Sequence, residues 1–246
     1  MPRSNILEVQ FIGSGDAFGS GGRLQPCVLI TDKSTRFALD FGLTALIGLH
    51  QKDIHPNTID AVFISHFHGD HCGGIPFLLM DAMLGSKREK PLTLIGPEGI
   101  EVHIKQLQDV LFPGSQIMTP KFDVEYVEIN PENPVLFGEY QITAVEAKHT
   151  ASTKPLALKV ETGQQTLVYT GDGELTEELI DFTDGADLAI AECYYYDKPV
   201  KWHLNYPDIQ HLKARNVVLT HMHENMLAHK DEVPETCAYD GMEIII

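Results

Sequence analysis

Cysteine is scarce in this chain, and the few cysteines that are present exclude one class of fold. They lie at positions 27, 72, 193 and 237 and show no paired spacing. Small secreted domains that depend on disulfides instead carry many closely spaced cysteines. Reduced thiols in a cytoplasmic protein are the simplest interpretation.

Basic residues are also few. The chain has 18 Lys and Arg against 35 Asp and Glu, which gives a formal net charge of −17. Nucleic-acid affinity comes largely from Lys and Arg that neutralise phosphates, so this balance argues against a nucleic-acid duplex or a tRNA as partner. The densest basic patch, Lys87-Arg88-Glu89-Lys90, is most simply a solvated loop.

Long apolar runs are absent as well. The longest, such as the segment 75–80, are far too short to cross a bilayer. Residues 1–5 lead into a short strand-like segment without the hydrophobic region of a signal peptide. We therefore expect no membrane association. A length of 246 residues with 43% hydrophobic residues predicts a single domain, residues 1–246, with a sizeable core.

Apolar segments bounded by turn residues predict strands and helices along the whole chain. Strands are expected at 7–12, 27–31, 37–40, 61–65, 92–95, 122–129, 140–147, 156–161, 165–170, 187–191, 216–220 and 242–246. Helices are expected at 41–50, 75–84, 97–111, 174–181 and 207–214. The glycine-rich segment 13–23 permits tight turns but lacks the Gly-Lys-Ser/Thr ending of a phosphate loop. This alternation predicts an α/β fold of two packed sheets with helices outside.

The segment Ser65–Gly74 carries the strongest chemical signal. His66, His68, Asp70 and His71 fall within six positions, directly after an apolar strand. Open α/β sheets place their sites at the carboxyl ends of strands, and imidazole with carboxylate suits zinc and neighbouring first-row metals. His66 and His68 point the same way in an extended chain, whereas the adjacent Asp70 and His71 cannot share that direction. One tight loop can therefore supply two pairs of ligands to two different metals.

This H-x-H-x-D-H pattern resembles the metallo-β-lactamase superfamily. The resemblance implies an αβ/βα four-layer sandwich, in which two mixed sheets pack together with helices outside. In that superfamily the residue after the last histidine is usually small and is not a ligand. We therefore interpret Cys72 as a packed small residue rather than as a soft metal ligand.

The resemblance also implies three further ligands, each near the end of a strand. A lone downstream histidine fits His149, which follows the expected strand 140–147. Asp172 follows Leu167-Val168-Tyr169-Thr170-Gly171, and His221 follows Val217-Val218-Leu219-Thr220. His223 competes with His221, but His221 is preferred because it lies directly at the strand end.

The resemblance divides these residues between two metals and a bridge. One metal would be held by His66, His68 and His149, and the other by Asp70, His71 and His221. Asp172 would bridge them, opposite a water or hydroxide. Zinc is the expected metal, with manganese as an alternative because oxygen ligands suit it too. We expect the remaining histidines to be packing or surface residues: His50, His55, His103, His211 and His229.

Further segments resemble ribonuclease Z and its relatives within this superfamily. They are Gly13-Ser14-Gly15, His149-Thr150, Gly171-Asp172 and Leu219-Thr220-His221. Ribonuclease Z also has a histidine some twenty residues before its last ligand, proposed as the proton donor to the leaving oxygen. His203 lies 18 positions before His221 (221 − 203) and fits that role, with phosphate positioning as the alternative. Asp70 and His203 are thus the candidate catalytic residues.

Two features separate this chain from ribonuclease Z itself. That enzyme holds tRNA with a long arm between its lone histidine and its bridging aspartate. Here only 23 positions separate them (172 − 149), and the net charge is −17. The chain is more similar to the small armless phosphodiesterases of this branch, such as those of the carbon–phosphorus lyase pathway. The closing segment of that group resembles Ala238–Ile244.

The resemblance predicts a dinuclear metal-dependent phosphodiesterase. Its substrate would be a small phosphate diester such as a cyclic nucleotide, attacked by a metal-bridging hydroxide. One alternative is a metal-dependent hydrolase of a thioester, a lactone or a β-lactam. A second is a non-catalytic binding protein of a cofactor pathway that keeps the same fold. A homodimer is expected from the resemblance alone.

Overall fold

Two seven-stranded sheets form the centre of the computed structural model, which describes residues 6–33 and 35–246. The signal-peptide prediction rests on residues 1–5, which lie outside the described residues. The first sheet has the order β14-β1-β2-β3-β4-β5-β6. Its strands are β1 (Glu8–Gly13), β2 (Cys27–Asp32), β3 (Thr35–Leu39), β4 (Ala61–Phe63), β5 (Leu92–Gly96), β6 (Val124–Glu128) and β14 (Glu243–Ile245).

The second sheet has the order β13-β12-β11-β10-β9-β8-β7. Its strands are β7 (Val135–Phe137), β8 (Tyr140–Glu146), β9 (Leu156–Glu161), β10 (Thr166–Tyr169), β11 (Leu188–Glu192), β12 (Val217–Thr220) and β13 (Thr236–Cys237). Both sheets are mixed: β3 to β6 run parallel in the first, as do β10 to β13 in the second, and the remaining pairs are antiparallel.

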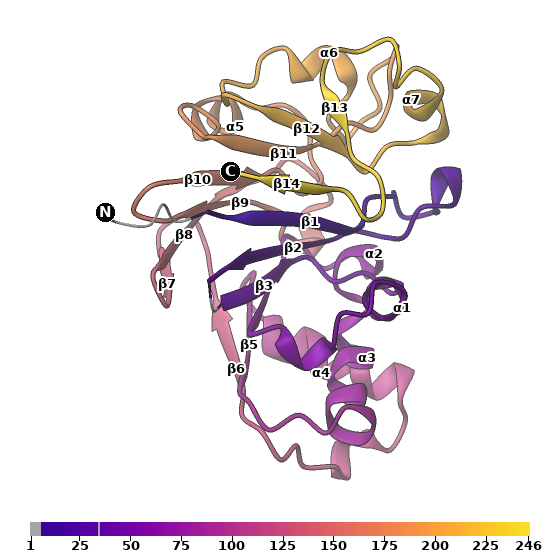
Figure 1. Cartoon of the computed structure of the whole chain (residues 1–246), viewed down its shortest axis with the longest axis vertical. Coiled ribbons are helices and arrows are strands. Elements are labelled where there is room, and N and C mark those ends of the chain that lie inside the picture. The colour runs from indigo at the N-terminus through magenta and orange to yellow at the C-terminus, as the bar shows by residue number, and fades with distance from the viewer. Residues whose placement is uncertain (1–5, 34) are drawn as a thin grey trace.

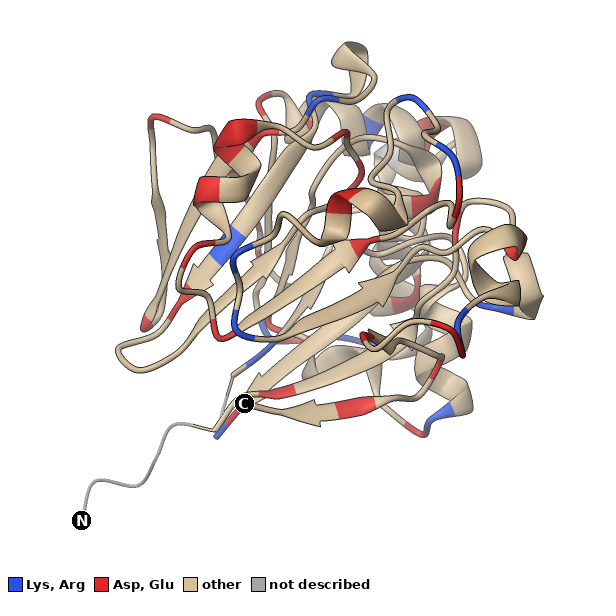
Figure 2. Ribbon diagram, turned by 90° about the horizontal axis from the view of Figure 1, so that it is seen from above, with Lys and Arg blue, Asp and Glu red and all other residues tan. Residues whose placement is uncertain are grey.

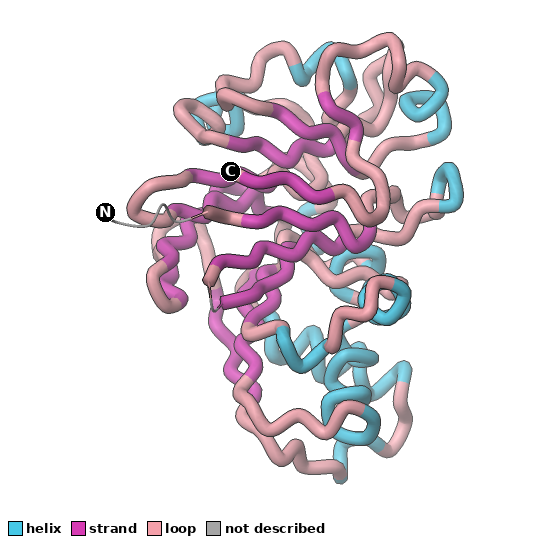
Figure 3. The backbone as a smooth tube through the Cα atoms, in the orientation of Figure 1, coloured by secondary structure: helices cyan, strands magenta, loops and turns pink. Residues whose placement is uncertain are grey.

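Helices cover the outer faces of both sheets (Figure 1). The first sheet is accompanied by α1 (Ala45–Gln51), α2 (Gly69–Cys72), α3 (Ile75–Met80) and α4 (Ile100–Leu111). The second is accompanied by α5 (Glu177–Phe182), α6 (Tyr206–Ile209) and α7 (Glu224–Ala228). The tube in Figure 3 shows the strands in the middle of the molecule and the helices at its periphery. The predicted four-layer sandwich of two mixed sheets with helices outside is therefore confirmed.

Alternation along the strands explains why the sheets pack in this way. In β3, Phe37 and Leu39 belong to the core between the sheets, whereas Ala38 faces the helices of the first sheet. Strand β2 follows the same rule, with Val28 and Ile30 on one face and Leu29 on the other. Successive side chains of a strand point to opposite faces, so a strand that is apolar on both faces must lie between two packed layers.

Short elements account for the differences from the sequence prediction. Strands β7 and β13 and helix α7 were not predicted, because each is too short to show a periodic pattern. The predicted ligand loop contains the four-residue helix α2, and helix α6 ends at Ile209 rather than near Ala214. Helix α4 begins at Ile100 rather than Pro97, because Gly99 adopts a left-handed conformation with φ 87° immediately before it.

Acidic residues are spread over the whole fold, with basic residues scattered between them (Figure 2). No single element carries the excess negative charge. Among the residues that the structure describes, no helix has the length and hydrophobicity needed to cross a membrane.

The carboxylate of Asp240 joins the C-terminal segment to the glycine-rich turn after β1. It accepts hydrogen bonds from the Ser14 backbone N–H (2.9 Å), the Ser14 hydroxyl (2.8 Å) and the Leu24 backbone N–H (2.7 Å). The carbonyl of Ser14 in turn accepts the backbone N–H of His221. Asp240 therefore stabilises the turn that supports the end of β12.

We predict that Asp240→Ala lowers the free energy of unfolding by about 2–4 kcal/mol, because three donors to one charged acceptor lose their partner together. Urea denaturation of the metal-free protein measures this change. Asp231→Ala, which removes an exposed aspartate, is the matched control and should stay close to wild type. Equal stability of the two variants would contradict the structural role of Asp240.

Candidate metal centre

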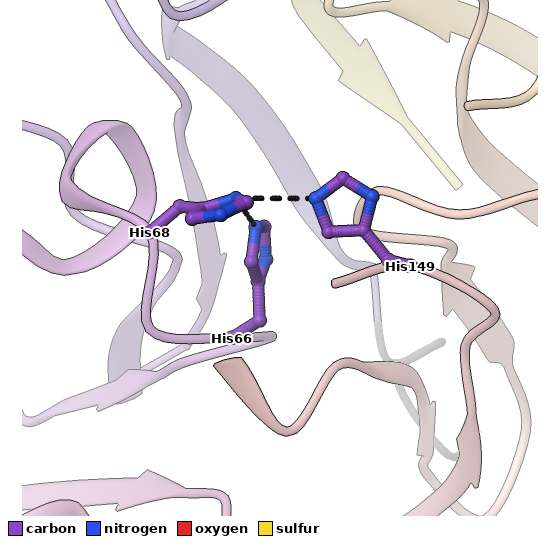
Figure 4. A group of neighbouring side chains, drawn as sticks. All are labelled: His66, His68 and His149. Carbon is purple, nitrogen blue, oxygen red and sulfur yellow. Dashed lines mark hydrogen bonds between the residues drawn. The ribbon is translucent and has the colours of Figure 1, made fainter. Parts of the chain in front are cut away.

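Three imidazoles form the first cluster of the site. His66 and His68 lie between β4 and α2, and His149 follows β8 in the other sheet. The Nε2 atom of His66 lies 3.0 Å from Nδ1 of His68, which lies 3.1 Å from Nε2 of His149. Figure 4 shows the three rings converging through these nitrogens. Separations near 3 Å are close to the roughly 3.3 Å expected between nitrogens that share one tetrahedral zinc ion.

Backbone and hydroxyl partners set the orientation of two of these rings. Nδ1 of His149 donates to the carbonyl of Trp202 at 2.6 Å, which leaves Nε2 free for the cluster. Nδ1 of His66 lies 3.0 Å from the Ser65 hydroxyl. Burial and repulsion from the charged form of His71 hold the pKa of His66 well below its usual value. This low pKa favours the neutral imidazole, the form in which histidine binds a metal.

The second cluster combines two carboxylates and two imidazoles: Asp70, His71, Asp172 and His221. One ligand atom from each lies within 4.8 Å of every other. His221 directly follows β12 and has φ 55°, a left-handed conformation that is uncommon for a residue other than glycine. Such strain persists only where surrounding contacts impose it, and it is frequent at functional sites.

The ligand atoms of this cluster fit a metal ion. The buried Nε2 of His71 makes no hydrogen bond, although Oδ2 of Asp70 lies 3.2 Å away and Oδ1 of Asp172 lies 3.3 Å away. Nε2 of His221 also lies 3.3 Å from Oδ2 of Asp70. Nε2 of His221 hydrogen-bonds Oδ2 of Asp70, whereas Nε2 of His71 lies near both carboxylates without a hydrogen bond, and this mixed N/O chemistry suits first-row divalent metals.

Asp172 lies with the second cluster, and its contacts explain its charge. Burial opposes ionisation, but His221 and His71 outweigh it and hold the pKa of the Asp172 carboxyl well below its usual value. Asp172 also lies near enough to His66 to interact with it electrostatically. A carboxylate oxygen of Asp172 lies within 4.8 Å of the ligand atoms of Asp70, His71 and His221.

Glu192 and His203 adjoin the second cluster and form a pair. Glu192 is the last residue of β11, and its buried carboxylate accepts the Nδ1–H of His203. The same carboxylate accepts backbone N–H groups of Gly173 and Leu204, each at 3.1 Å. Nδ1 of His203 lies 4.0 Å from Asp172. Burial disfavours the charged imidazole, but Glu192 outweighs it and raises the pKa of His203 above its usual value.

Glu192 and Asp40 were not predicted from the sequence, although both show the feature that marks the candidate ligands, a position at the end of an apolar strand. Each is an acidic residue at the end of an apolar strand, β11 for Glu192 and β3 for Asp40. The buried carboxylate of Asp40 accepts from Nδ1 of His71 at 2.6 Å and from the Tyr169 hydroxyl at 2.7 Å. This bond fixes the tautomer of His71 and turns its Nε2 toward the second cluster.

An aromatic side chain restricts the position of His203. The ring of Tyr194 stacks on that of His203, with centroids 4.4 Å apart and planes 22° apart. Burial and the carboxylate of Asp16 raise the pKa of the Tyr194 hydroxyl, which keeps it neutral. Three consecutive tyrosines after a strand, Tyr194-Tyr195-Tyr196, are the feature of the sequence that indicates this aromatic contact.

Other residues considered in the sequence lie outside these clusters. Cys72 is buried in the apolar core of the first sheet, and burial raises the pKa of its thiol to about 12. His223 caps helix α7, where its side chain accepts the backbone N–H of Asn225. Within the described residues, five further histidines take no part in the clusters: His50, His55, His103, His211 and His229.

Comparisons of the sequence identify related proteins. The profile of a family described as "Anti-Pycsar protein Apyc1" matches residues 7–237. Ribonuclease Z of Pyrococcus horikoshii is 33% identical over 144 residues, which cover 58% of this chain and 45% of that enzyme. The chain thus matches less than half of that enzyme's length. The "Probable metallo-hydrolase YhfI" of Bacillus subtilis is 28% identical over 232 residues, covering 89% of this chain and 91% of that protein.

Solved structures agree with the fold. The crystal structure of YhfI from Bacillus subtilis, described as a metallo-β-lactamase fold protein, superimposes with a TM-score of 0.78 at 22% identity and covers 99% of this chain and 100% of that one. A diphosphatase from the PhnP family superimposes with a TM-score of 0.76 at 16% identity and covers 97% of each chain. The resemblance to the ribonuclease Z-like branch is therefore confirmed.

We predict that His221→Ala lowers the metal content of the protein, because His221 supplies one ligand atom of the second cluster. His223→Ala is the matched control. It should retain the metal and lose about 1 kcal/mol of stability with the helix cap. Elemental analysis of both variants measures the metal, and thermal denaturation measures the stability. Loss of metal in His223→Ala with wild-type content in His221→Ala would reassign the site.

Proposed function

Since the chain belongs to the Anti-Pycsar protein Apyc1 family, whose profile covers residues 7–237, we propose that it is a dinuclear metal-dependent phosphodiesterase. Its substrate is a small phosphate diester such as a cyclic nucleotide. The observation that carries the proposal is the placement of two ligand clusters side by side, with the rings of His66 and His71 4.1 Å apart between centroids. The Glu192–His203 pair lies next to Asp172.

The ligand sets support two metal sites of different character. The first cluster offers three imidazoles, a set typical of zinc, and the second adds two carboxylates, which zinc and manganese both accept. Asp172 belongs to the second cluster and also interacts electrostatically with His66 of the first, which supports a bridging role. When bound, two divalent ions would supply an activated water nucleophile and Lewis acidity toward the phosphoryl oxygens.

The contacts of His203 suit protonation of the leaving group, the step that follows attack on phosphorus. Its Nδ1–H is committed to Glu192, so its Nε2 is the nitrogen that can transfer a proton. Glu192 holds this tautomer, and stacking of Tyr194 holds the plane of the ring. A group oriented in this way can protonate an alkoxide leaving group. We therefore assign His203 as the general acid, with Glu192 and Tyr194 as positioning residues.

The segment between His149 and Asp172 supports a small substrate. It contains a single turn of 3₁₀ helix (Ala151–Thr153) and the antiparallel pair β9 and β10, joined by residues 162–165. No arm projects from residues 149–172, all of which the structure describes. Together with the net charge of −17, this favours a free small molecule over a structured RNA.

A panel of substrates tests the reaction class. We expect zinc- or manganese-loaded protein to hydrolyse bis(p-nitrophenyl) phosphate, and Asp172→Ala to lose most of that activity. A preference for an aryl thioester, a lactone or a β-lactam would assign the alternative hydrolase class instead. Binding of metal without hydrolysis of any panel member would indicate a non-catalytic binding protein. Efficient, salt-sensitive cleavage of pre-tRNA would contradict the small-substrate proposal.

We predict that His203→Ala retains its metal but lowers turnover by roughly 10²–10⁴-fold for diesters with alkoxide leaving groups. The loss should shrink for nitrophenolate, which leaves without a proton. Steady-state kinetics with a cyclic nucleotide and with bis(p-nitrophenyl) phosphate measure the two cases. His211→Ala, an exposed histidine outside the clusters, is the control. The same loss with both leaving groups would make His203 a positioning residue.

A further inference from the structure

A basic pocket lies at the opposite edge of the first sheet from the candidate ligands. It has a volume of about 710 Å³, and its lining residues fall within 82–89 and 118–121. These two segments precede β5 and β6, which run parallel to β4. The candidate ligands follow the carboxyl end of β4, whereas the pocket lies at the amino ends of the neighbouring strands. We name it the Arg88 pocket, and the proposed reaction does not use it.

The lining of the Arg88 pocket is cationic, although the chain as a whole is strongly acidic. It contains Lys87, Arg88 and Lys121, together with one acidic residue, Glu89. Lys87 and Lys121 are exposed. Within the part of the chain that the structure describes, neither ammonium group forms an ion pair, unlike the lysines that pair with carboxylates elsewhere. Both ammonium groups are therefore available to an anion in the pocket.

Arg88 is the buried member of this set, with only 2% of its surface exposed. The prediction that the basic segment is a solvated loop is therefore wrong at this residue. Nε of Arg88 donates to the carbonyl of Lys90 at 2.6 Å, and Nη2 donates to the carbonyls of Ile59, at 2.8 Å, and of Pro91. Three acceptors around one planar group fix the orientation of the guanidinium.

The remaining nitrogen of this guanidinium, Nη1 of Arg88, is left for a ligand. It makes no hydrogen bond to any residue in 6–33 or 35–246, and its surface is not fully buried. Burial lowers the pKa of Arg88, and the carboxylate of Asp60 offsets this only in part. A buried cation is costly unless its donors are bonded and its charge is balanced. An anion in the pocket would supply both.

The rest of the lining suits an organic group beside the charge. Ala82, Met83 and Met118 are apolar, and Thr119 adds a hydroxyl. The backbone N–H of Arg88 donates to the carbonyl of Ala82 at 2.8 Å, which holds two parts of the wall together. A preformed cavity of about 300–1,000 Å³ with a few placed polar groups is typical of small-molecule sites.

We propose that the Arg88 pocket binds a dianionic phosphoryl group, at a site separate from the candidate metal centre. A fixed guanidinium and two flexible ammonium groups form a donor set that suits phosphate, which carries about −1.5 to −2 charge at pH 7. A carboxylate offers one negative charge and two oxygens to the same three cations. Free phosphate and a small phosphomonoester share the phosphoryl group. This assignment does not depend on the proposed phosphodiesterase function.

Amide shifts of the ¹⁵N-labelled, zinc-loaded full chain test the site, because shifts at the pocket and at the metal centre can be followed separately. The protein is titrated with phosphate, glycerol 3-phosphate and acetate at neutral pH and constant ionic strength. We expect phosphate to shift the amides of Lys87, Arg88, Glu89 and Lys121. Tighter binding of glycerol 3-phosphate would support a phosphomonoester as ligand, and equal or weaker binding would support free phosphate. Acetate bound as tightly as phosphate would overturn the phosphoryl assignment.

Two double variants with the same total charge separate the pocket from a general effect of charge. Lys87→Gln with Lys121→Gln removes two cations of the lining and leaves the buried Arg88 in place. Lys90→Gln with Lys230→Gln is the matched control, because both residues are exposed and outside the lining. Thermal denaturation checks that each variant is folded.

We expect the pocket variant to raise the Kd for phosphate at the pocket amides by roughly 10-fold or more, the scale of losing two charge-assisted hydrogen bonds. The control variant should stay close to wild type. Equal Kd values in the two variants, or phosphate shifts confined to the metal centre, would overturn the site.

Discussion

The buried carboxylate of Asp40 is the group on which the geometry of the ligand clusters depends. It accepts hydrogen bonds from the backbone N–H and hydroxyl of Ser65, from Nδ1 of His71 and from the hydroxyl of Tyr169. Ser65 and His71 belong to the ligand segment of the first sheet, whereas Tyr169 belongs to β10 of the second. A buried charge is stable only when it is fully paired, so these bonds tie the two sheets together where the ligands lie.

The candidate ligands of the site all lie at the same edge of the two sheets. The candidate ligand segment 66–71 follows β4 of the first sheet, and the other candidate ligands follow β8, β10 and β12 of the second. Because each sheet supplies only part of either cluster, the site exists only when the sandwich is assembled. Strained residues mark this edge: Asp40, Trp202 and His221 all have positive φ angles. Each is held by hydrogen bonds to the site or its supporting turns.

The ligand segment could be predicted because His66, His68, Asp70 and His71 directly follow an apolar strand, and the resemblance to the superfamily then implied the downstream ligands near later strand ends: His149, Asp172 and His221. Asp40 and Glu192 carry the same signal, but their importance depends on partners that only the folded chain brings to them. Asp40 meets Tyr169 across 129 positions, and Glu192 meets His203 only after the loop that follows β11 folds back. The fold class could be predicted from the long strands. Elements as short as β13, two residues, have no sequence period and exist only through tertiary contacts.

Titration of metal into metal-free protein, with hydrolysis of a phosphate diester as the readout, tests the central claim most directly. The account requires both ligand clusters to be filled before the site is complete. Activity should therefore rise with added zinc or manganese until two equivalents per chain are bound, and then stay constant. A plateau at one equivalent, or full activity in protein shown by elemental analysis to hold no metal, would contradict the dinuclear site.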